Sequence, residues 1–193
     1  MRFDADSGWF PDLRHCPSPN FSTRPAGAGR TALRDIDLIV IHGISLPPGR
    51  FLGDAVERLF QNRLDANAHP YFAGIADLRV SAHFLVRRNG ALVQCVSLYD
   101  RAWHAGRSSF DGRADCNDFS VGIEVEGTDA DPCNAFQFAR LVKLTKAVMR
   151  EIGLRDAQRV VGHVDVAPGR KTDPGPNFPW EAFRGALDAG IRK

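Results

Sequence analysis

The chain has 193 residues, of which 44% are hydrophobic and 25% charged, fractions that are ordinary for a soluble globular protein. Its 25 lysines and arginines nearly balance its 23 aspartates and glutamates, so the net charge of +2 indicates neither a nucleic-acid nor a membrane partner. The longest purely aliphatic run, residues 38–41, is far too short to span a bilayer. We therefore expect one domain over residues 1–193, with residues 1–35 packed on it as an irregular arm, and no obligate protein partner.

Signals for export and for a disulfide framework are both lacking. Residues 1–6 do not form a basic segment followed by an apolar one, as a secretory signal would. The four cysteines have no C-x-x-C pairing, and four cysteines in a chain of this length do not make a disulfide scaffold. The simplest expectation is a reduced, cytoplasmic protein.

The first elements along the chain are a strand, a short helix and a long loop. Residues 37–41 predict a buried strand because they are mostly aliphatic. A helix is predicted from Asp54, since Asp54 and Glu57 have the spacing of a capping box. The aperiodic segment 62–78 predicts a long ordered loop, and loops of that length usually line a site.

The remaining elements are a hairpin of strands 80–86 and 91–96 around Asn89-Gly90, a strand at 121–127, a helix at 135–152, a strand at 159–161 and a helix from Pro179. Asn-Gly between alternating segments is the hairpin signal. In the long helix apolar residues recur at three and four, and Gly153 ends it. The fold class predicted is α/β (α+β), a single mixed central sheet flanked by helices.

Two histidines follow predicted strands and are therefore expected at the rim of the sheet. His42 follows the strand at 37–41, and His163 follows the strand at 159–161. Two imidazoles and one carboxylate are a catalytic zinc set, because three protein ligands leave a fourth position for water. Asp165 and Asp173 compete for the third place. Asp173 has Lys171 two residues before it, Asp165 could instead cap a turn, and spacing alone does not decide between them.

A hydrolytic metal site also needs a group that handles protons. Glu124 and Glu126 lie on the same face of the strand at 121–127, either as a solvated edge or with one of them facing the site. His83 is more typical of a packed, hydrogen-bonded strand histidine than of a ligand. His104 follows the predicted hairpin and precedes a Gly/Ser loop, a common setting for substrate contact.

Six ordered blocks of the sequence carry a family resemblance. They are residues 41–49, 69–75, 79–83, 101–106, 116–124 and 171–176. Together they closely resemble the AmpD proteins, zinc-dependent anhydro-N-acetylmuramoyl-L-alanine amidases of bacterial cell-wall recycling, which share a fold with type 2 amidases and peptidoglycan recognition proteins. The resemblance runs from Ser18 to Trp180, nearly the whole chain.

The resemblance implies a role for each matching position. It places one zinc ion on His42, His163 and Asp173, the catalytic glutamate at Glu124 and an oxyanion-stabilising lysine at Lys171. Positions around the substrate pocket fall on Tyr71, Arg79, His83, Trp103 and His104. The implied substrate is a small muropeptide, cleaved at the amide between the muramoyl lactyl group and L-alanine, with Glu124 accepting a proton from water and donating it to the leaving amine.

Two positions depart from the family pattern. Gly43 stands where members usually have asparagine, and Asp115 stands where they usually have arginine, which leaves stem-peptide preference open. Arg113 could compensate for Asp115 in substrate binding if its loop is extended. Two other functions remain to be separated from recycling: the same chemistry on intact murein, and a non-catalytic peptidoglycan-binding module. The second normally loses zinc ligands, which this chain keeps.

Overall fold

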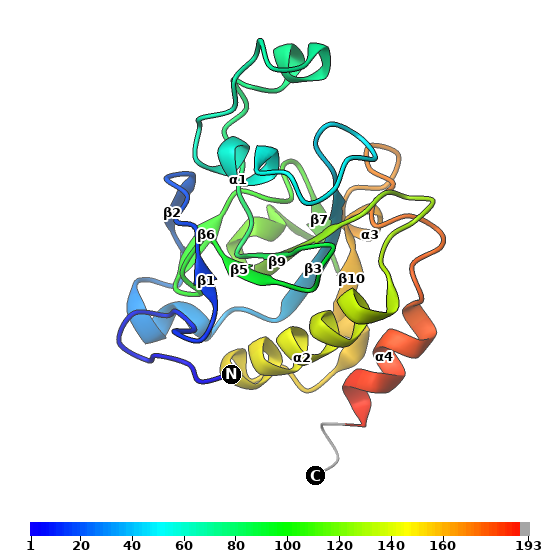
Figure 1. Cartoon of the computed structure of the whole chain (residues 1–193). Helices are drawn as coiled ribbons and strands as arrows, with labels where there is room; N and C mark the ends of the chain where they lie inside the picture. Colours follow the sequence, from blue (N-terminus) through cyan, green and yellow to red (C-terminus); the bar gives the residue numbers. More distant parts are fainter. Residues whose placement is uncertain (190–193) are drawn as a thin grey trace.

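A six-stranded mixed sheet forms the centre of the protein, and the computed structural model describes residues 1–189 (Figure 1). The strands lie in the order β1 (Arg14–His15), β5 (Leu92–Gln94), β4 (Phe84–Val86), β9 (Ser120–Glu126), β3 (Leu38–Ile44) and β10 (Val160–Gly162). Strands β4 and β5 are antiparallel, and the other neighbours in this sheet are parallel. The predicted mixed α/β architecture is confirmed.

The two central strands, β3 and β9, bring the candidate site residues of separate segments together. Residues 38–41 are fully buried, because β3 is covered on both faces, and such strands have continuous aliphatic runs. The parallel register places His42 on β3 directly beside Glu124 on β9. Strand β3 runs to Ile44, beyond its predicted end at residue 41, so His42 lies within the strand rather than after it. Strand β9 begins and ends one residue before its predicted bounds.

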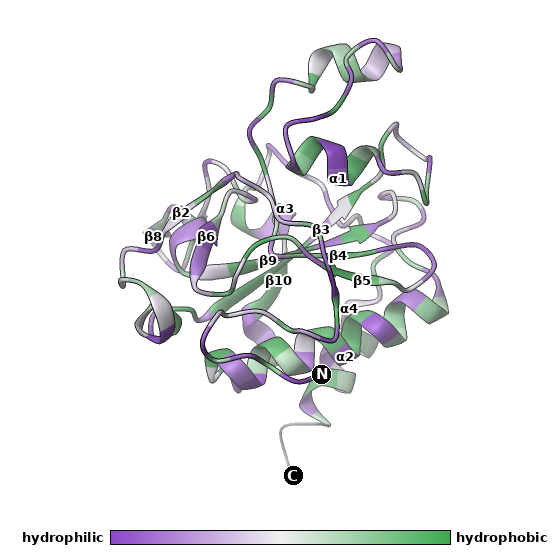
Figure 2. Ribbon diagram, turned by 60° about the vertical axis from the view of Figure 1, so that its left-hand side comes forward, coloured by the Kyte–Doolittle hydropathy of each residue, from purple (hydrophilic) through white to green (hydrophobic). Residues whose placement is uncertain are grey.

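Two helices cover one face of the sheet. Helix α2 (Ala135–Ile152) has the predicted bounds, begins with a capping box between Asn134 and Gln137, and ends at Gly153 with φ 74°. Helix α4 (Trp180–Asp188) packs beside it. Figure 2 shows the sheet strands as largely hydrophobic, whereas α2 alternates between hydrophobic and hydrophilic residues. The apolar side of α2 therefore closes the larger core.

The opposite side carries α1 (Ala55–Phe60) and the segment 61–79, which extends away from the sheet at the top of Figure 1. The predicted loop 62–78 contains a 3₁₀ helix, η2 (Pro70–Gly74), in which His69 accepts a hydrogen bond from the backbone N–H of Tyr71. A second apolar cluster beneath this segment includes Phe60 and Phe72. The loop therefore has a packed base and an exposed outer part.

Short elements complete the fold. They are β2 (Phe21–Thr23), β6 (Asp100–Ala102), β7 (Ser109–Phe110), β8 (Arg113–Ala114), α3 (His163–Val166), η1 (Gly29–Leu33), η3 (Cys116–Asp118) and η4 (Ala157–Arg159). Strand β2 pairs antiparallel with β6, and β7 with β8. The arm at residues 1–35 is thus less irregular than predicted, since β1 and β2 pair with strands far along the chain. Within residues 1–189, no helix has the length and apolar character that crossing a bilayer requires.

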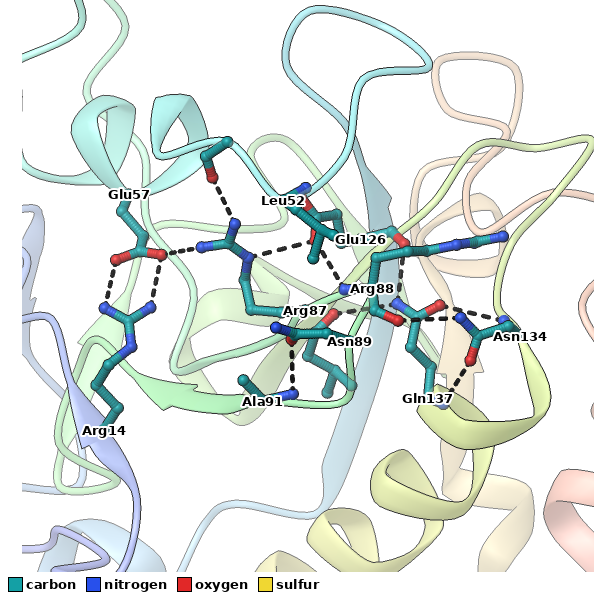
Figure 3. A network of polar contacts seen from close by, with 12 residues as sticks. Arg14, Leu52, Glu57, Arg87, Arg88, Asn89, Ala91, Glu126, Asn134 and Gln137 are labelled. Atoms are coloured by element: carbon teal, nitrogen blue, oxygen red, sulfur yellow. Dashed lines mark hydrogen bonds and ion pairs between the residues drawn. The ribbon is translucent and has the colours of Figure 1, made fainter.

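The predicted capping box at the start of α1 is wrong. The side chain of Asp54 makes no capping hydrogen bond, and Glu57 instead binds Arg14 through two hydrogen bonds of 2.6 and 2.7 Å. Glu57 also pairs with Arg87, whose guanidinium reaches Glu126 at 3.3 Å (Figure 3). A mostly buried ionic network therefore joins the arm, α1, β4 and β9.

Candidate metal centre

Three potential metal ligands converge at one end of the central strands. The Nδ1 atoms of His42 and His163 lie 2.9 Å apart, and Oδ2 of Asp173 lies 3.4 and 3.1 Å from them. Among residues 1–189 this is the one group of three metal-ligating side chains that come together. Strand β10 runs parallel to β3 and ends with Gly162 beside Ile41, so the next residues, His163 and His42, meet although they are 121 positions apart.

The chain turns sharply where β10 ends, and this turn sets the position of His163. Strand β10 stops at Gly162, so His163 is the first residue of α3 rather than the last of a strand. Asp165 Oδ2 accepts a hydrogen bond of 2.7 Å from the backbone N–H of Gly162. Asp165, the other candidate for the third ligand, therefore caps the turn and is not part of the cluster.

The donor atoms of the cluster fit a tetrahedral zinc ion. Ligand atoms about 2.0–2.2 Å from such an ion lie about 3.3 Å from one another, close to the separations between His42, His163 and Asp173. The Nε2 atoms of both histidines contact other groups, at 2.9 and 3.2 Å, so both Nδ1 atoms face the same point. Two imidazoles and one carboxylate leave a fourth position for water or substrate.

Burial keeps the His42 imidazole neutral, the form in which it binds a metal. It lowers the pKa of His42 to about 4, and the neighbouring His163 and Lys171 act in the same direction, although Asp173 opposes them. Burial alone would raise the pKa of Asp173, but hydrogen bonds with His163 and His42 outweigh it and hold that pKa below its ordinary value. The cluster thus contains a neutral ligand and an ionised one.

Glu124 lies beside the cluster as an unsatisfied acid. It is 9% exposed, and its Oε2 atom has no hydrogen-bond partner among the described residues. Burial, followed by the negative charge of Asp173, raises the pKa of Glu124 to about 8, while Lys171 opposes the shift. A carboxylate with a raised pKa next to a metal position is suited to accept and return a proton. The alternative of a solvated sheet edge is wrong, because β9 is central.

The cluster opens into a cavity of about 420 Å³, a volume that suits a small ligand. Glu124, Lys171, Tyr71, Trp103 and His104 line it together with the three candidate ligands. Apolar side chains, among them Leu46, Phe60, Ile75, Leu78 and Val80, form part of its wall. The cavity therefore combines polar groups at its base with an apolar side.

The other residues expected near the substrate have different positions. Arg79 lines a smaller adjoining cavity of about 190 Å³, together with Trp103 and His104. His83 is fully buried, and its Nδ1 accepts a hydrogen bond of 3.0 Å from the Gly122 N–H. Arg113 forms an ion pair of 2.9 Å with Asp37 and is not among the residues that line either cavity.

The two positions that depart from the family pattern also differ from each other. Gly43 lines the larger cavity, where a Cβ atom would meet Pro174 at 3.5 Å and Asp173 at 3.7 Å, both ordinary contacts. Asp115 has a left-handed backbone with φ 56° and lines neither cavity. Of these two positions, Gly43 is therefore the one that lines the cavity.

Sequence reasoning gave no role to two buried residues behind the site. Arg24 is 2% exposed and donates hydrogen bonds to the carbonyls of Leu98, Asn117 and Ser120. Asn117 is 5% exposed and binds two backbone N–H groups through its side chain. The local sequence around Arg24 carries no signal for burial, whereas Asn117 lies in one of the six blocks of resemblance.

Fold and site together describe an α/β domain of the amidase type. Residues 32–176 match the family model described as N-acetylmuramoyl-L-alanine amidase. The chain belongs to the N-acetylmuramoyl-L-alanine amidase family.

Within this family the chain is similar to AmpD. It is 47% identical to the 1,6-anhydro-N-acetylmuramyl-L-alanine amidase AmpD of Citrobacter freundii over 97% of both chains. A crystal structure of a selenomethionine AmpD derivative superimposes with a TM-score of 0.87 at 48% identity, covering 96% of this chain and 99% of that one. A complex of Escherichia coli AmiD with anhydro-N-acetylmuramic acid-L-Ala-D-γ-Glu-L-Lys matches with a TM-score of 0.56 at 29% identity, covering 85% of this chain and 60% of that one.

Proposed function

We propose that this protein is a zinc-dependent amidase that hydrolyses the amide between 1,6-anhydro-N-acetylmuramic acid and L-alanine in soluble muropeptides, in cytoplasmic cell-wall recycling. One observation carries the proposal: two histidine Nδ1 atoms and a carboxylate oxygen converge within 4.8 Å in the cavity that also holds Glu124 and Lys171. The name of the Citrobacter freundii relative supports the substrate.

His42, His163 and Asp173 would hold one zinc ion through the atoms that face one another. When bound there, zinc supplies Lewis acidity, which polarises a carbonyl and lowers the pKa of water towards about 7. The ionised Asp173 would offset part of the positive charge. This chain's own residues must then handle protons and bind the substrate.

Glu124 would take the proton from the water that attacks the amide carbonyl. Its raised pKa makes it a competent base and, once protonated, an acid that gives the proton to the leaving amine of L-alanine. The Lys171 ammonium lines the same cavity and would stabilise the negative charge that develops on the carbonyl oxygen.

The cavity walls would bind the rest of the muropeptide. Tyr71, 45% exposed, and Trp103 offer aromatic surface for the sugar, and Arg79 offers positive charge for a stem-peptide carboxylate. His83 and Arg113, which line neither cavity, would act on substrate only through the residues beside them. The muropeptide found in the AmiD complex supports a small ligand of this chemical class.

Mass spectrometry of the products tests this proposal. Purified protein is incubated separately with an anhydromuramoyl tetrapeptide and with whole murein sacculi. We expect the soluble substrate to yield free anhydromuramic acid and a peptide with a new L-alanine amino terminus, with little release from sacculi. Cleavage at any other bond would overturn the assigned chemistry. Equal release from sacculi would instead indicate an enzyme of the intact wall.

A further inference from the structure

The segment after β6 lies directly behind the two histidines of the metal centre. His104 Nδ1 is 2.9 Å from Nε2 of His42, and the backbone oxygen of Ala105 is 3.2 Å from Nε2 of His163. Two adjacent residues of one segment therefore contact the outer ring nitrogen of both histidines. The segment contacts neither Nδ1 atom, which leaves those atoms facing the ligand position.

The direction of the hydrogen bonds follows from two backbone carbonyls. Ala105 O can only accept, so when Nδ1 binds a metal ion His163 carries its hydrogen on Nε2 and donates it to that oxygen. The Ser120 hydroxyl donates its single hydrogen to Cys116 O at 2.6 Å, so Ser120 Oγ accepts from His104 Nε2 at 3.1 Å. A neutral His104 then has a bare Nδ1, which accepts from the Nε2–H of His42.

With an ion bound, both imidazoles thus keep a bare Nδ1 in the cluster. In its absence the Nδ1 atoms of His163 and His42 also face a second acceptor, Asp173 Oδ2, at 3.1 and 3.4 Å. Metal-binding histidines commonly donate their second N–H to a protein acceptor, which fixes the tautomer and the ring orientation. Here the fold supplies a histidine nitrogen as the acceptor for His42 and a carbonyl oxygen as the acceptor for His163.

The acceptors themselves are held in place from several directions. Asn117 Oδ1 accepts hydrogen bonds from the backbone N–H groups of His104, at 3.1 Å, and Ala105, at 2.8 Å. Arg170 donates a hydrogen bond of 2.6 Å to Ala105 O. A Cβ atom on Gly122 would lie 2.4 Å from His104 Cγ, so β9 leaves room for this ring only because it has glycine there. The ring of His104 is consequently packed against the backbone of β9.

We propose that the dipeptide His104–Ala105 sets the tautomer and orientation of both zinc-binding histidines, and that Asn117 is the positioning residue that holds this dipeptide. The inference rests on the zinc site proposed above, and it adds that metal affinity is fixed by groups outside the ligand set. It also gives His104 a role towards His42 in addition to the expected contact with substrate.

Two pairs of variants separate this role from simple packing. His104→Phe keeps a ring but removes the acceptor, whereas His104→Asn keeps a polar group near the Nδ1 position. Asn117→Leu removes the acceptor of both backbone N–H groups, and Asn117→Asp keeps it. His15→Phe, in the exposed arm, is the matched control for loss of a histidine. Zinc affinity is measured by competition with a chelator, and thermal unfolding of each metal-free variant is recorded.

We expect zinc affinity to fall about 10- to 100-fold in His104→Phe and Asn117→Leu, to recover largely in His104→Asn and Asn117→Asp, and to stay unchanged in His15→Phe. Affinity as tight as wild type in His104→Phe would overturn the inference. If Asn117→Leu does not fold, its pair Asn117→Asp and both His104 variants still decide the result.

A second measurement reports the tautomers directly. Long-range ¹H–¹⁵N NMR spectra of the zinc-loaded wild type report which ring nitrogen of each histidine carries hydrogen, and we expect the hydrogen on Nε2 in His42, His104 and His163. A hydrogen on Nδ1 of His42 or His163 would contradict the inference. Failure of the wild type to bind zinc or to hydrolyse muropeptide would overturn the proposed function instead, so the two failures are distinguishable.

Discussion

Two glutamates on one face of β9 have very different surroundings. Glu124 and Glu126 are two residues apart, and both are buried, at 9% and 2% exposure. Glu126 accepts hydrogen bonds from the backbone N–H groups of Leu52, at 2.6 Å, and Arg88, at 2.7 Å, and it pairs with Arg87 (Figure 3). Glu124 has an oxygen with no partner among the described residues. Burial alone therefore does not separate a structural acid from a reactive one.

The two regions differ in whether the protein provides hydrogen-bond donors to the buried carboxylate. Around Glu126 the protein supplies donors, so the carboxylate stabilises the fold. Around Glu124 the protein does not compensate for the desolvation of the carboxylate, so a proton, a metal or a substrate has to stabilise it. Substitutions in the two regions should accordingly have opposite effects on stability and on activity.

The largest effect is expected from the metal centre itself. His163→Ala removes one of the three proposed zinc ligands, and we expect stoichiometric zinc and amidase activity to be lost together, because two ligands hold the ion poorly. Metal content by atomic absorption and turnover of an anhydromuropeptide measure this change. A variant that keeps one zinc per chain would remove His163 from the ligand set.

Glu124→Gln should affect chemistry while leaving the metal in place. We expect turnover to fall by about 10²- to 10⁴-fold, because the proton acceptor is lost, with zinc content unchanged. Stability should be equal to wild type or higher, since a buried acid without a partner is replaced by a neutral amide. Near-normal turnover would show that another group takes the proton.

Glu126→Gln should give the reverse pattern. We expect a loss of about 1–3 kcal/mol in the free energy of unfolding, because Leu52, Arg87 and Arg88 lose a charged acceptor. Turnover of the folded variant should remain close to wild type. Urea denaturation and steady-state kinetics at one pH measure both quantities. A variant that is as stable as wild type but inactive would reverse the assignment of the two glutamates.

The smallest effect concerns pH and the same ionic network. Burial alone would raise the pKa of Glu57, but Arg14 and then Arg87 outweigh it, so the pKa lies below its ordinary value of 4.5. A lowered pKa stabilises the fold above the unfolded-state value, and this contribution disappears as the pH falls through the folded-state value. Glu57→Gln should therefore be less stable than wild type at neutral pH, and the difference should shrink in acid. A difference that grows below pH 4.5 would contradict this sign.

Strong local signals made part of this fold predictable. The aliphatic run of β3 and the three-four periodicity of α2 each depend on neighbours within one element, and both elements form. Strands β1 and β2 have two and three residues, and they exist only because β5 and β6 supply hydrogen-bond partners far along the chain. No local pattern records such pairing.

The candidate site was likewise predictable only where local sequence determines the position of a residue. The positions of His42 and Glu124 followed from strands that the sequence indicates, and their pairing followed from the register. The choice between Asp165 and Asp173 did not, since it depends on a turn that one carboxylate caps while the other reaches His163. The different surroundings of Glu124 and Glu126 depend on Arg87, which directly follows strand β4.

Adding zinc back to the metal-free protein tests the central claim most directly. Hydrolysis of an anhydromuramoyl peptide is followed while zinc is added in increments. We predict that the metal-free protein is inactive and that the rate rises in proportion to zinc until one ion per chain is present, with no further rise. Full hydrolysis by the metal-free protein would contradict the account.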